Sequence, residues 1–180
     1  KINKTYFGVG NTKVYIEKMC KFYSRLGRTK YTVIRHSNIY GEHDKYDLEK
    51  SHVFGATITK VMNAKNDVVV WGKGEEKRDL LYVGDLVDFV NKAINHQRNK
   101  YELVNVGLGK AIAIKNLVKL IIKVSGKKLE QKHDISQPSI PTYLALNINK
   151  ANKIFHWTPK TTLRTGILKS INWWKDNIKK

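Results

Sequence analysis

The chain contains a single cysteine, Cys20, among its 180 residues. An internal disulfide is therefore impossible, and a metal cluster held by cysteines is excluded. The histidines outside the candidate site below show no metal-ligand spacing, so we expect no metal: His43, His96, His133 and His156. For a chain with this cysteine usage, a reducing, cytoplasmic setting is the default expectation.

Long apolar runs are also missing. No run approaches the roughly 20 residues that cross a bilayer, and the first residues lack the apolar segment of a secretory signal. We therefore expect no association with a membrane. The sequence begins at Lys1 rather than at a methionine, and we expect it to be a fragment or a processed piece of a longer protein.

Acidic residues are scarce, with 15 Asp and Glu against 34 Lys and Arg, for a net charge of +19. Such an excess raises the question of nucleic-acid binding. The basic residues are scattered, however, and adjacent lysines occur only at Lys127-Lys128 and Lys179-Lys180. The pattern favours solvated charge over a nucleic-acid surface, so nucleic acid is not an expected partner. The charge would still attract a doubly phosphorylated ligand.

The glycine fingerprint G-x-G-x-x-G does not occur. The closest glycine pairs are Gly8/Gly10, Gly72/Gly74 and Gly107/Gly109, and none is followed by a third glycine at the required spacing. This fingerprint shapes the turn on which a Rossmann domain binds the pyrophosphate of a dinucleotide. These 180 residues do not carry it.

Helix and strand patterns alternate along the chain, which indicates an α/β fold. The 41% hydrophobic content is enough for a substantial core. The patterns predict helices over 10–26, 51–64, 85–94, 114–125 and 163–178, and extended segments over 31–35, 68–71, 80–83, 102–106 and 128–133. We expect Gly27 to end the first helix and Asp85 to cap the helix that follows it.

The most informative segment follows the extended run 31–35. Arg35, His36 and Ser37 lead into Asn38-Ile39-Tyr40-Gly41, which we interpret as a loop beyond the carboxyl end of that strand. Ligands bind at this edge of an open α/β sheet. A helix carrying Lys13, a strand and then a polar loop together suggest a nucleotide-handling enzyme.

Several motifs fall in a fixed order. Lys13 precedes Asn38 by 25 residues, and Asn38 precedes His52 by 14. Three further motifs follow them: Val69-Val70-Trp71-Gly72, Arg78-Asp79-Leu80-Leu81-Tyr82-Val83 with Asp85-Leu86, and Val104-Asn105-Val106-Gly107. In this order, the chain resembles the second half of an extended short-chain dehydrogenase/reductase of the NAD-dependent epimerase/dehydratase family, nearest to the GDP-L-fucose synthases.

The resemblance implies a fold and a function. The fold would be the C-terminal part of a Rossmann-type parallel sheet plus a small α/β substrate-binding lobe. Residues 1–50 would end the NAD(P)-binding domain, and 51–180 would mainly form the lobe, with some segments returning to the sheet. The function would be that of an NAD(P)-dependent nucleotide-sugar epimerase/reductase, with NADP or NAD as cofactor and a nucleotide-diphosphate sugar as substrate.

The family's helix lysine matches Lys13. In such enzymes this lysine hydrogen-bonds the nicotinamide ribose and lowers the pKa of a catalytic tyrosine. The tyrosine should lie one helical turn earlier, where this chain has Val9. Tyr6 is the nearest phenol and is the candidate to replace it. The alternatives are that another group acts or that the redox step is lost.

The resemblance also assigns the residues after the first strand. Arg35, His36 and Ser37 match the stretch that passes the nicotinamide, and Asn38 matches an amide bridging cofactor and substrate phosphate. A local turn bond is the alternative for Asn38. His52 matches a second catalytic acid beside the cofactor, since imidazole exchanges protons near neutral pH. A plain helix-start residue is its alternative.

On the substrate side, Lys60 replaces a family arginine that contacts the substrate. Trp71 would stack on the base or sugar, or else belong to the core. Arg78 matches the arginine that grips the diphosphate, where a planar cation binds bidentately; its neighbour Asp79 could instead neutralise it. Ser139 stands in the late substrate loop where an acidic residue is usual, so the base stays open.

Two expectations concern the chain as a whole. We expect these 180 residues alone to have no measurable dehydrogenase activity, and a non-catalytic nucleotide-sugar-binding module is the alternative function. The helix with Lys13 also carries Val14, Ile16, Met19 and Phe22. In the family such a helix pairs across a two-fold axis, so we expect a homodimer, although packing on the sheet explains part of this face.

Overall fold

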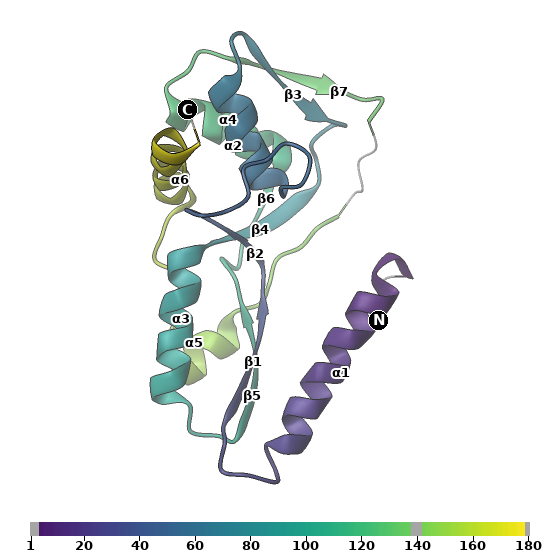
Figure 1. Cartoon of the computed structure of the whole chain (residues 1–180), viewed down its shortest axis with the longest axis vertical. Helices are drawn as coiled ribbons and strands as arrows, with labels where there is room; N and C mark the ends of the chain where they lie inside the picture. The colour runs from purple at the N-terminus through teal and green to yellow at the C-terminus, as the bar shows by residue number, and fades with distance from the viewer. Residues whose placement is uncertain (1–3, 138–141, 179–180) are drawn as a thin grey trace.

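The computed structural model describes residues 4–137 and 142–178, and it is elongated, with α1 beside its lower half (Figure 1). The helices are η1 Lys4–Tyr6, α1 Phe7–Tyr23, α2 Val53–Asn63, α3 Val83–His96, α4 Ile114–Ser125, α5 Asn149–Phe155 and α6 Leu163–Asn177. The strands are β1 Tyr31–His36, β2 Asn38–Tyr40, β3 Asp67–Trp71, β4 Lys77–Tyr82, β5 Tyr101–Val106, β6 Ala111–Ala113 and β7 Glu130–Asp134. The expected α/β class is confirmed.

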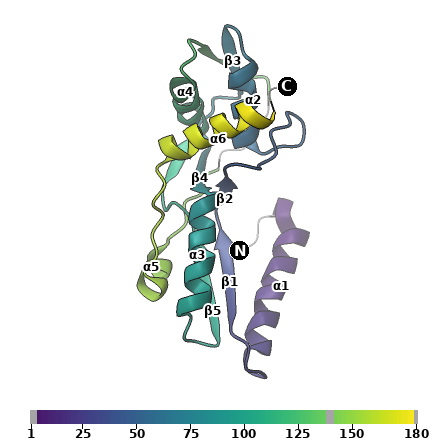
Figure 2. The ribbon, with the colours of Figure 1, turned by 60° about the vertical axis from the view of Figure 1, so that its left-hand side comes forward.

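One end of the molecule is built on the parallel pair β1–β5, in which Tyr31 lies opposite Tyr101. Helices α1 and α3 lie on opposite sides of β1 (Figure 2). On the α3 side, the ring of Phe89 packs edge-to-face on Phe155 and Trp157, each 5.3 Å away between centroids. This aromatic cluster joins α3 to the C-terminal end of α5, and it forms the core of this end.

The other end holds the three-stranded sheet β2–β4–β6, the parallel pair β3–β7, and helices α2, α4 and α6. Helix α4 forms because Ile114, Leu117, Val118 and Ile121 place one buried stripe at helical spacing. It ends at Gly126, whose φ of 75° is left-handed. Helix α6 is fastened to α2 by a buried hydrogen bond of 3.0 Å from Trp174 Nε1 to Thr59 Oγ1. These contacts hold α2, on which the candidate site depends.

The prediction of a loop at Asn38 is wrong. Residues Asn38–Tyr40 form β2, which pairs in parallel with Leu80–Tyr82 of β4. Tyr40 is buried against Phe54, with ring centroids 4.2 Å apart. The partner strand lies about forty residues later in the sequence, so no local pattern could reveal the pairing. The chain thus passes from one end of the molecule to the other without leaving extended structure.

Several helix boundaries were also wrong, by one to three residues. Helix α1 ends at Tyr23 rather than at 26, because Ser24 turns its hydroxyl back to the Lys21 carbonyl oxygen at 2.8 Å. Tyr82, not Asp85, occupies the N-cap position of α3. The sequence patterns also missed β6 and α5, which are only 3 and 7 residues long.

Asp85 has a different structural role from the expected cap. Its buried carboxylate accepts backbone hydrogen bonds from Lys160 at 3.2 Å and Thr161 at 3.0 Å. Asp85 therefore fixes the segment that enters α6, whose own N-cap is Thr162. In this way a residue at the start of α3 positions a helix that begins almost eighty residues later.

Candidate functional site

A cleft of about 400 Å³ opens between α2, β3 and β4. Three of the residues predicted to bind substrate meet there: Lys60 from α2, Trp71 from the end of β3 and Arg78 from β4. Val70 and Val118 are among its apolar lining residues. An apolar cleft of this size with a few convergent polar groups is typical of a small-molecule site.

Lys60 and Trp71 form one unit within the cleft. The ammonium of Lys60 lies 5.2 Å from the centre of the Trp71 ring, which is cation–π geometry. Trp71 is 56% exposed, so the interpretation of this residue as a core tryptophan is wrong. Its indole therefore has a free surface on which a planar base or a sugar can pack.

Arg78 is half-buried at the cleft wall, and Thr142 holds its guanidinium. One terminal nitrogen donates to the Thr142 hydroxyl and, at 3.2 Å, to the carbonyl oxygen of Lys77. The alternative in which Asp79 neutralises it is wrong, because the Asp79 carboxylate accepts from backbone amides instead. Within residues 4–137 and 142–178, Arg78 forms no ion pair, so its charge is available to an anionic ligand.

His52 lies at the rim of the cleft. It is exposed and occupies the N-cap position of α2, but its ring makes no capping hydrogen bond. Its neighbours Ser51 and Val53 line the cleft. Burial raises the pKa of Asp44, against the opposing effects of the Lys45 backbone hydrogen bond and of the nearby His52 charge. The exposed imidazole is therefore accessible to a ligand.

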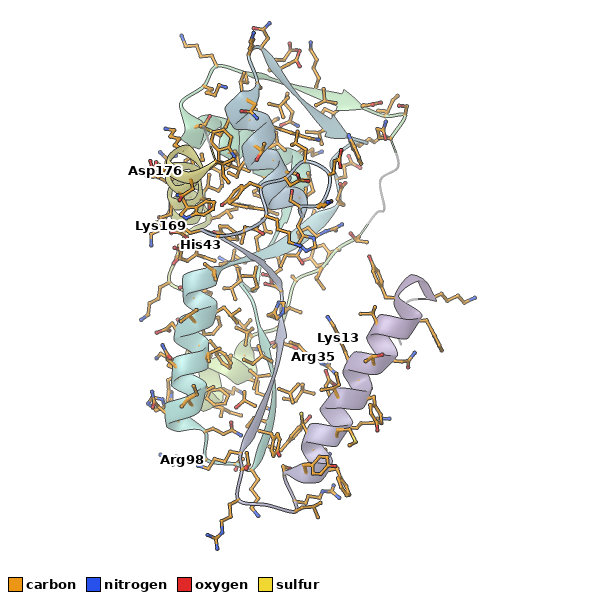
Figure 3. The ribbon with its side chains drawn as sticks, viewed as in Figure 1. Lys13, Arg35, His43, Arg98, Lys169 and Asp176 are labelled. Atoms are coloured by element: carbon orange, nitrogen blue, oxygen red, sulfur yellow. The ribbon has the colours of Figure 1, made fainter. Side chains whose placement is uncertain are left out.

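The residues predicted to bind cofactor lie elsewhere, between α1 and β1. Lys13 and Arg35 extend into the space between these two elements (Figure 3). His36 is exposed, and its Nδ1 donates to the Ser37 carbonyl oxygen at 2.8 Å. Asn38 is half-buried at the start of β2. The structure thus places these predicted cofactor residues on α1, at the end of β1 and at the start of β2, whereas His52 lies apart from them at the cleft rim.

Two of these residues are less available to a ligand in this structure: Arg35 is paired with Glu17, and Ser37 is buried. The guanidinium of Arg35 makes two hydrogen bonds with Glu17, of 2.7 and 2.5 Å. The side chain of Ser37 is 3% exposed, and its hydroxyl has no hydrogen-bond partner among the residues that the structure describes. Lys13 and His36 are exposed, so their side chains are accessible to a ligand. The pyrophosphate would need a glycine-rich turn that this sequence does not contain.

The pair Glu17–Arg35 predicts a pH dependence. The Arg35 hydrogen bond and charge outweigh burial and lower the pKa of Glu17. Because the folded-state pKa is lowered, the pair stabilises the contact of α1 with β1 above the unfolded-chain pKa, and this contribution is lost as pH falls through the lowered value. We expect an NMR titration of the Glu17 carboxyl to show a midpoint below the ordinary value of about 4.3.

Arg35→Gln is expected to return the Glu17 midpoint to its ordinary range. Arg25→Gln, at an exposed position just after α1, serves as the matched control and should leave the midpoint unchanged. A midpoint that is the same in the Arg35→Gln variant and in the unmodified chain would contradict this account.

The structure assigns no role to Tyr6, the phenol that is the candidate to replace the expected tyrosine. Tyr6 lies in η1, is 62% exposed and makes no hydrogen bond among the described residues. Val9, one turn before Lys13, is also exposed on α1. The role of Tyr6 stays a prediction, and so do the roles of the other candidate residues. Ser139 lies outside the described residues.

Sequence reasoning missed several polar groups at the cleft. Glu49 and Glu76 line it, and their carboxylates can accept hydrogen bonds from sugar hydroxyls or base N–H groups. No motif singled them out, since one precedes a helix and the other follows a glycine turn. Thr142 was missed because only the fold brings it to Arg78.

Two absences hold for the part of the chain that the structure describes. No group of three or more His, Cys, Asp or Glu side chains is arranged to hold a metal ion. No helix there is both long and apolar enough to cross a bilayer.

The parallel strand pairs and the helices beside them define the chain as an α/β protein. The model of the family described as "NAD dependent epimerase/dehydratase family" matches residues 8–107, more than half of the chain. The chain belongs to this family. Both the family resemblance and the cofactor class expected from the sequence are thereby confirmed.

The relatives handle nucleotide sugars of more than one base. GDP-L-colitose synthase from Yersinia pseudotuberculosis is 32% identical over 174 residues, which are 94% of this chain and 56% of that protein. A putative UDP-glucose 4-epimerase from Methanocaldococcus jannaschii is 32% identical over 168 residues, 93% of this chain and 53% of that protein. The chain therefore spans about half the length of the curated relatives it matches.

A solved structure of a nucleotide-sugar epimerase has a similar fold. UDP-glucose 4-epimerase from Thermotoga maritima, determined with UDP-glucose, superposes with a TM-score of 0.81 at 25% sequence identity. The match covers 94% of this chain and 53% of that one. The Rossmann-type fold expected from the sequence is confirmed.

Proposed function

We propose that the cleft binds a nucleotide-diphosphate sugar, and that the chain supplies the substrate side of an NAD(P)-dependent nucleotide-sugar epimerase/reductase similar to the GDP-L-fucose synthases. The observation that carries the proposal is the meeting of Lys60, Trp71 and Arg78 in one cleft. These residues come from three different elements, and each supplies a group that a nucleotide sugar requires.

Each group has a distinct part in binding. The planar Arg78 guanidinium can bind two oxygens of the diphosphate, and Lys60 adds a second positive charge beside it. The free surface of Trp71 stacks on the base or on the sugar. The relatives include enzymes of GDP-sugars and of UDP-sugars, and the proposal leaves the base open.

In the proposed reaction, His52 exchanges the proton at the sugar carbon. A proton exchanged at a sugar carbon beside a ketone inverts that carbon, and imidazole can take and return such a proton near neutral pH. The exposed ring at the cleft rim is free for this role. Lys13 and His36 would hold the nicotinamide end of NAD or NADP, which supplies hydride chemistry when bound, and Asn38 would lie between cofactor and substrate.

The second candidate is a non-catalytic nucleotide-sugar-binding module of the same fold. Val9 favours it, since an aliphatic side chain cannot donate the proton that a tyrosine at this position would provide. Both candidates share the cleft, so they differ in turnover and not in binding.

Calorimetric titration of the chain with a UDP-sugar and with a GDP-sugar tests the proposal. We expect one of them to bind, and the corresponding free sugar not to bind. Arg78→Ala is expected to weaken that binding by about 30-fold, since a hydrogen bond to a charged group contributes about 1.5–3 kcal/mol.

The matched control is Arg98→Ala. Arg98 lies at the far end of the molecule from the cleft (Figure 3) and should leave the affinity unchanged. The proposal fails if neither nucleotide sugar binds, or if both arginine variants lose the same affinity.

The remaining expectations are part of the proposal. The division at residue 50 is proposed as the boundary between cofactor and substrate regions. A homodimer through α1 is supported by large apolar side chains that are more than half exposed on this helix, namely Phe7, Val9, Tyr15, Ile16 and Phe22. A reducing, cytoplasmic setting is supported by the single cysteine.

A further inference from the structure

Asp79, the neighbour of Arg78 on β4, is completely buried and has no counter-ion among the described residues. Successive side chains of a strand point to opposite faces, so its carboxylate is directed away from the cleft. There it accepts three backbone hydrogen bonds, from Leu108 at 2.8 Å, Gly109 at 3.1 Å and Leu146 at 3.0 Å. Through these three hydrogen bonds the buried carboxylate joins two separate loops to β4.

One of these loops, the segment that contains Leu146, also contacts Arg78. The segment 142–146 runs along β4, where the Lys77 amide donates to the Thr142 carbonyl oxygen at 2.8 Å. The Leu144 amide donates back to the Lys77 carbonyl oxygen at 3.3 Å. The first residue of this segment, Thr142, accepts from the Arg78 guanidinium, and the last, Leu146, donates to Asp79.

The backbone at Gly107 packs closely against the Asp79 carboxylate. A Cβ atom at Gly107 would lie 2.8 Å from Asp79 Oδ2 and 3.2 Å from Ser37 Oγ. Only a residue without a side chain therefore fits at 107 while the carboxylate keeps its place. Because three backbone donors hold the Asp79 carboxylate on the face away from the cleft, its effect on a ligand has to pass through the backbone segment that it holds.

We propose that Asp79 is a positioning residue for binding of the diphosphate: by holding the segment 142–146 along β4, it keeps the Thr142 hydroxyl where it orients the Arg78 guanidinium. The proposal deepens the proposed function and rests on it. A purely structural anchor would stabilise the same loops without any specific effect on the phosphate contact.

Asp79→Asn tests the proposal with little change in shape, because one carboxylate oxygen becomes an NH₂ group that faces backbone donors. We expect the affinity for the nucleoside diphosphate of the preferred base to fall about tenfold. The affinity for the nucleoside alone should stay within twofold. Both can be measured by NMR titration of the Trp71 indole signal, which also reports weak binding.

Thr142→Val is the companion variant, because it removes the hydroxyl that Arg78 contacts and leaves the buried carboxylate intact. It should show the same selective loss, and it keeps the proposal testable if Asp79→Asn does not fold. In an Arg78→Ala background, Asp79→Asn should cause no further loss of diphosphate affinity.

Other results would overturn the assignment. Equal losses for nucleoside and nucleoside diphosphate in either variant, or an undiminished effect of Asp79→Asn without Arg78, would mean that Asp79 is only structural. If the unmodified chain binds neither UDP- nor GDP-sugar, the proposed function fails and the assignment fails with it. Failure of the proposed function can be told apart from failure of the Asp79 assignment alone, because it is seen already with the unmodified chain.

Discussion

The 180-residue chain is expected to oxidise no NADPH in the presence of a GDP-4-keto-6-deoxysugar. Two physical reasons lead to this expectation. The position one turn before Lys13 is Val9, and loss of a positioned proton donor costs about 10²–10⁴ in rate. The sequence also contains no glycine-rich turn to bind the dinucleotide pyrophosphate. Absorbance of NADPH at high protein concentration measures the rate directly.

The control is binding of a nucleotide sugar by the same preparation, which shows that an absent rate does not reflect an unfolded sample. Turnover that disappears in Lys13→Met or His52→Asn would contradict the expectation. It would also remove the non-catalytic module as a candidate function.

Gly55→Ala is expected to lower the free energy of unfolding by about 3 kcal/mol, in the upper range for an overpacked site. Within a helix, alanine is normally better than glycine by about 0.5–1 kcal/mol. At this position on α2, however, an added Cβ would overlap the backbone carbonyl oxygen of Lys45. A backbone atom cannot move aside as a flexible side chain does, so the loop and the helix have to separate.

Urea denaturation followed by circular dichroism measures the change. Gly8→Ala is the matched control, since a Cβ at this helical position of α1 has no neighbour within 4 Å. It should leave the protein as stable or slightly more stable. A Gly55→Ala variant as stable as the unmodified chain would show that α2 does not pack closely on the 41–46 loop, and that His52 and Lys60 are positioned in another way.

Most helices and the longer strands could be predicted from the sequence, because their signals are local. The buried stripe of α4 follows from Ile114, Leu117, Val118 and Ile121, which recur at helical spacing. The strand β2 could not be predicted in this way, since its three residues become a strand only by pairing with β4. Asp85 was misassigned for the same reason: its partners, Lys160 and Thr161, lie far along the chain.

The candidate site was also predicted only in part from the sequence. The family resemblance predicted Lys60, Trp71 and Arg78 as substrate residues, and these three do meet in one cleft. No spacing in the sequence indicated Thr142 or the carboxylates Glu49 and Glu76. The place of Glu49 and Glu76 at the cleft, and that of Thr142 against Arg78, depends on loops, and loop paths are set by packing against distant elements.

The sequence by itself determined what this chain lacks. Covalent identity is unaffected by folding, so a missing glycine-rich turn, a valine before Lys13 and a single cysteine hold in any conformation. Local periodicity likewise determined most of the helices and strands, because each depends on neighbours within a few residues.

Only the tertiary structure decided what the remaining residues do. Arg78 and Asp79 are adjacent in the chain, yet the strand directs one toward the cleft and the other into the interior. Trp71 ends an apolar strand, and its exposure at the end of β3 excludes a place in the core. These outcomes depend on contacts between segments far apart in the sequence, and such contacts exist only once the chain has folded.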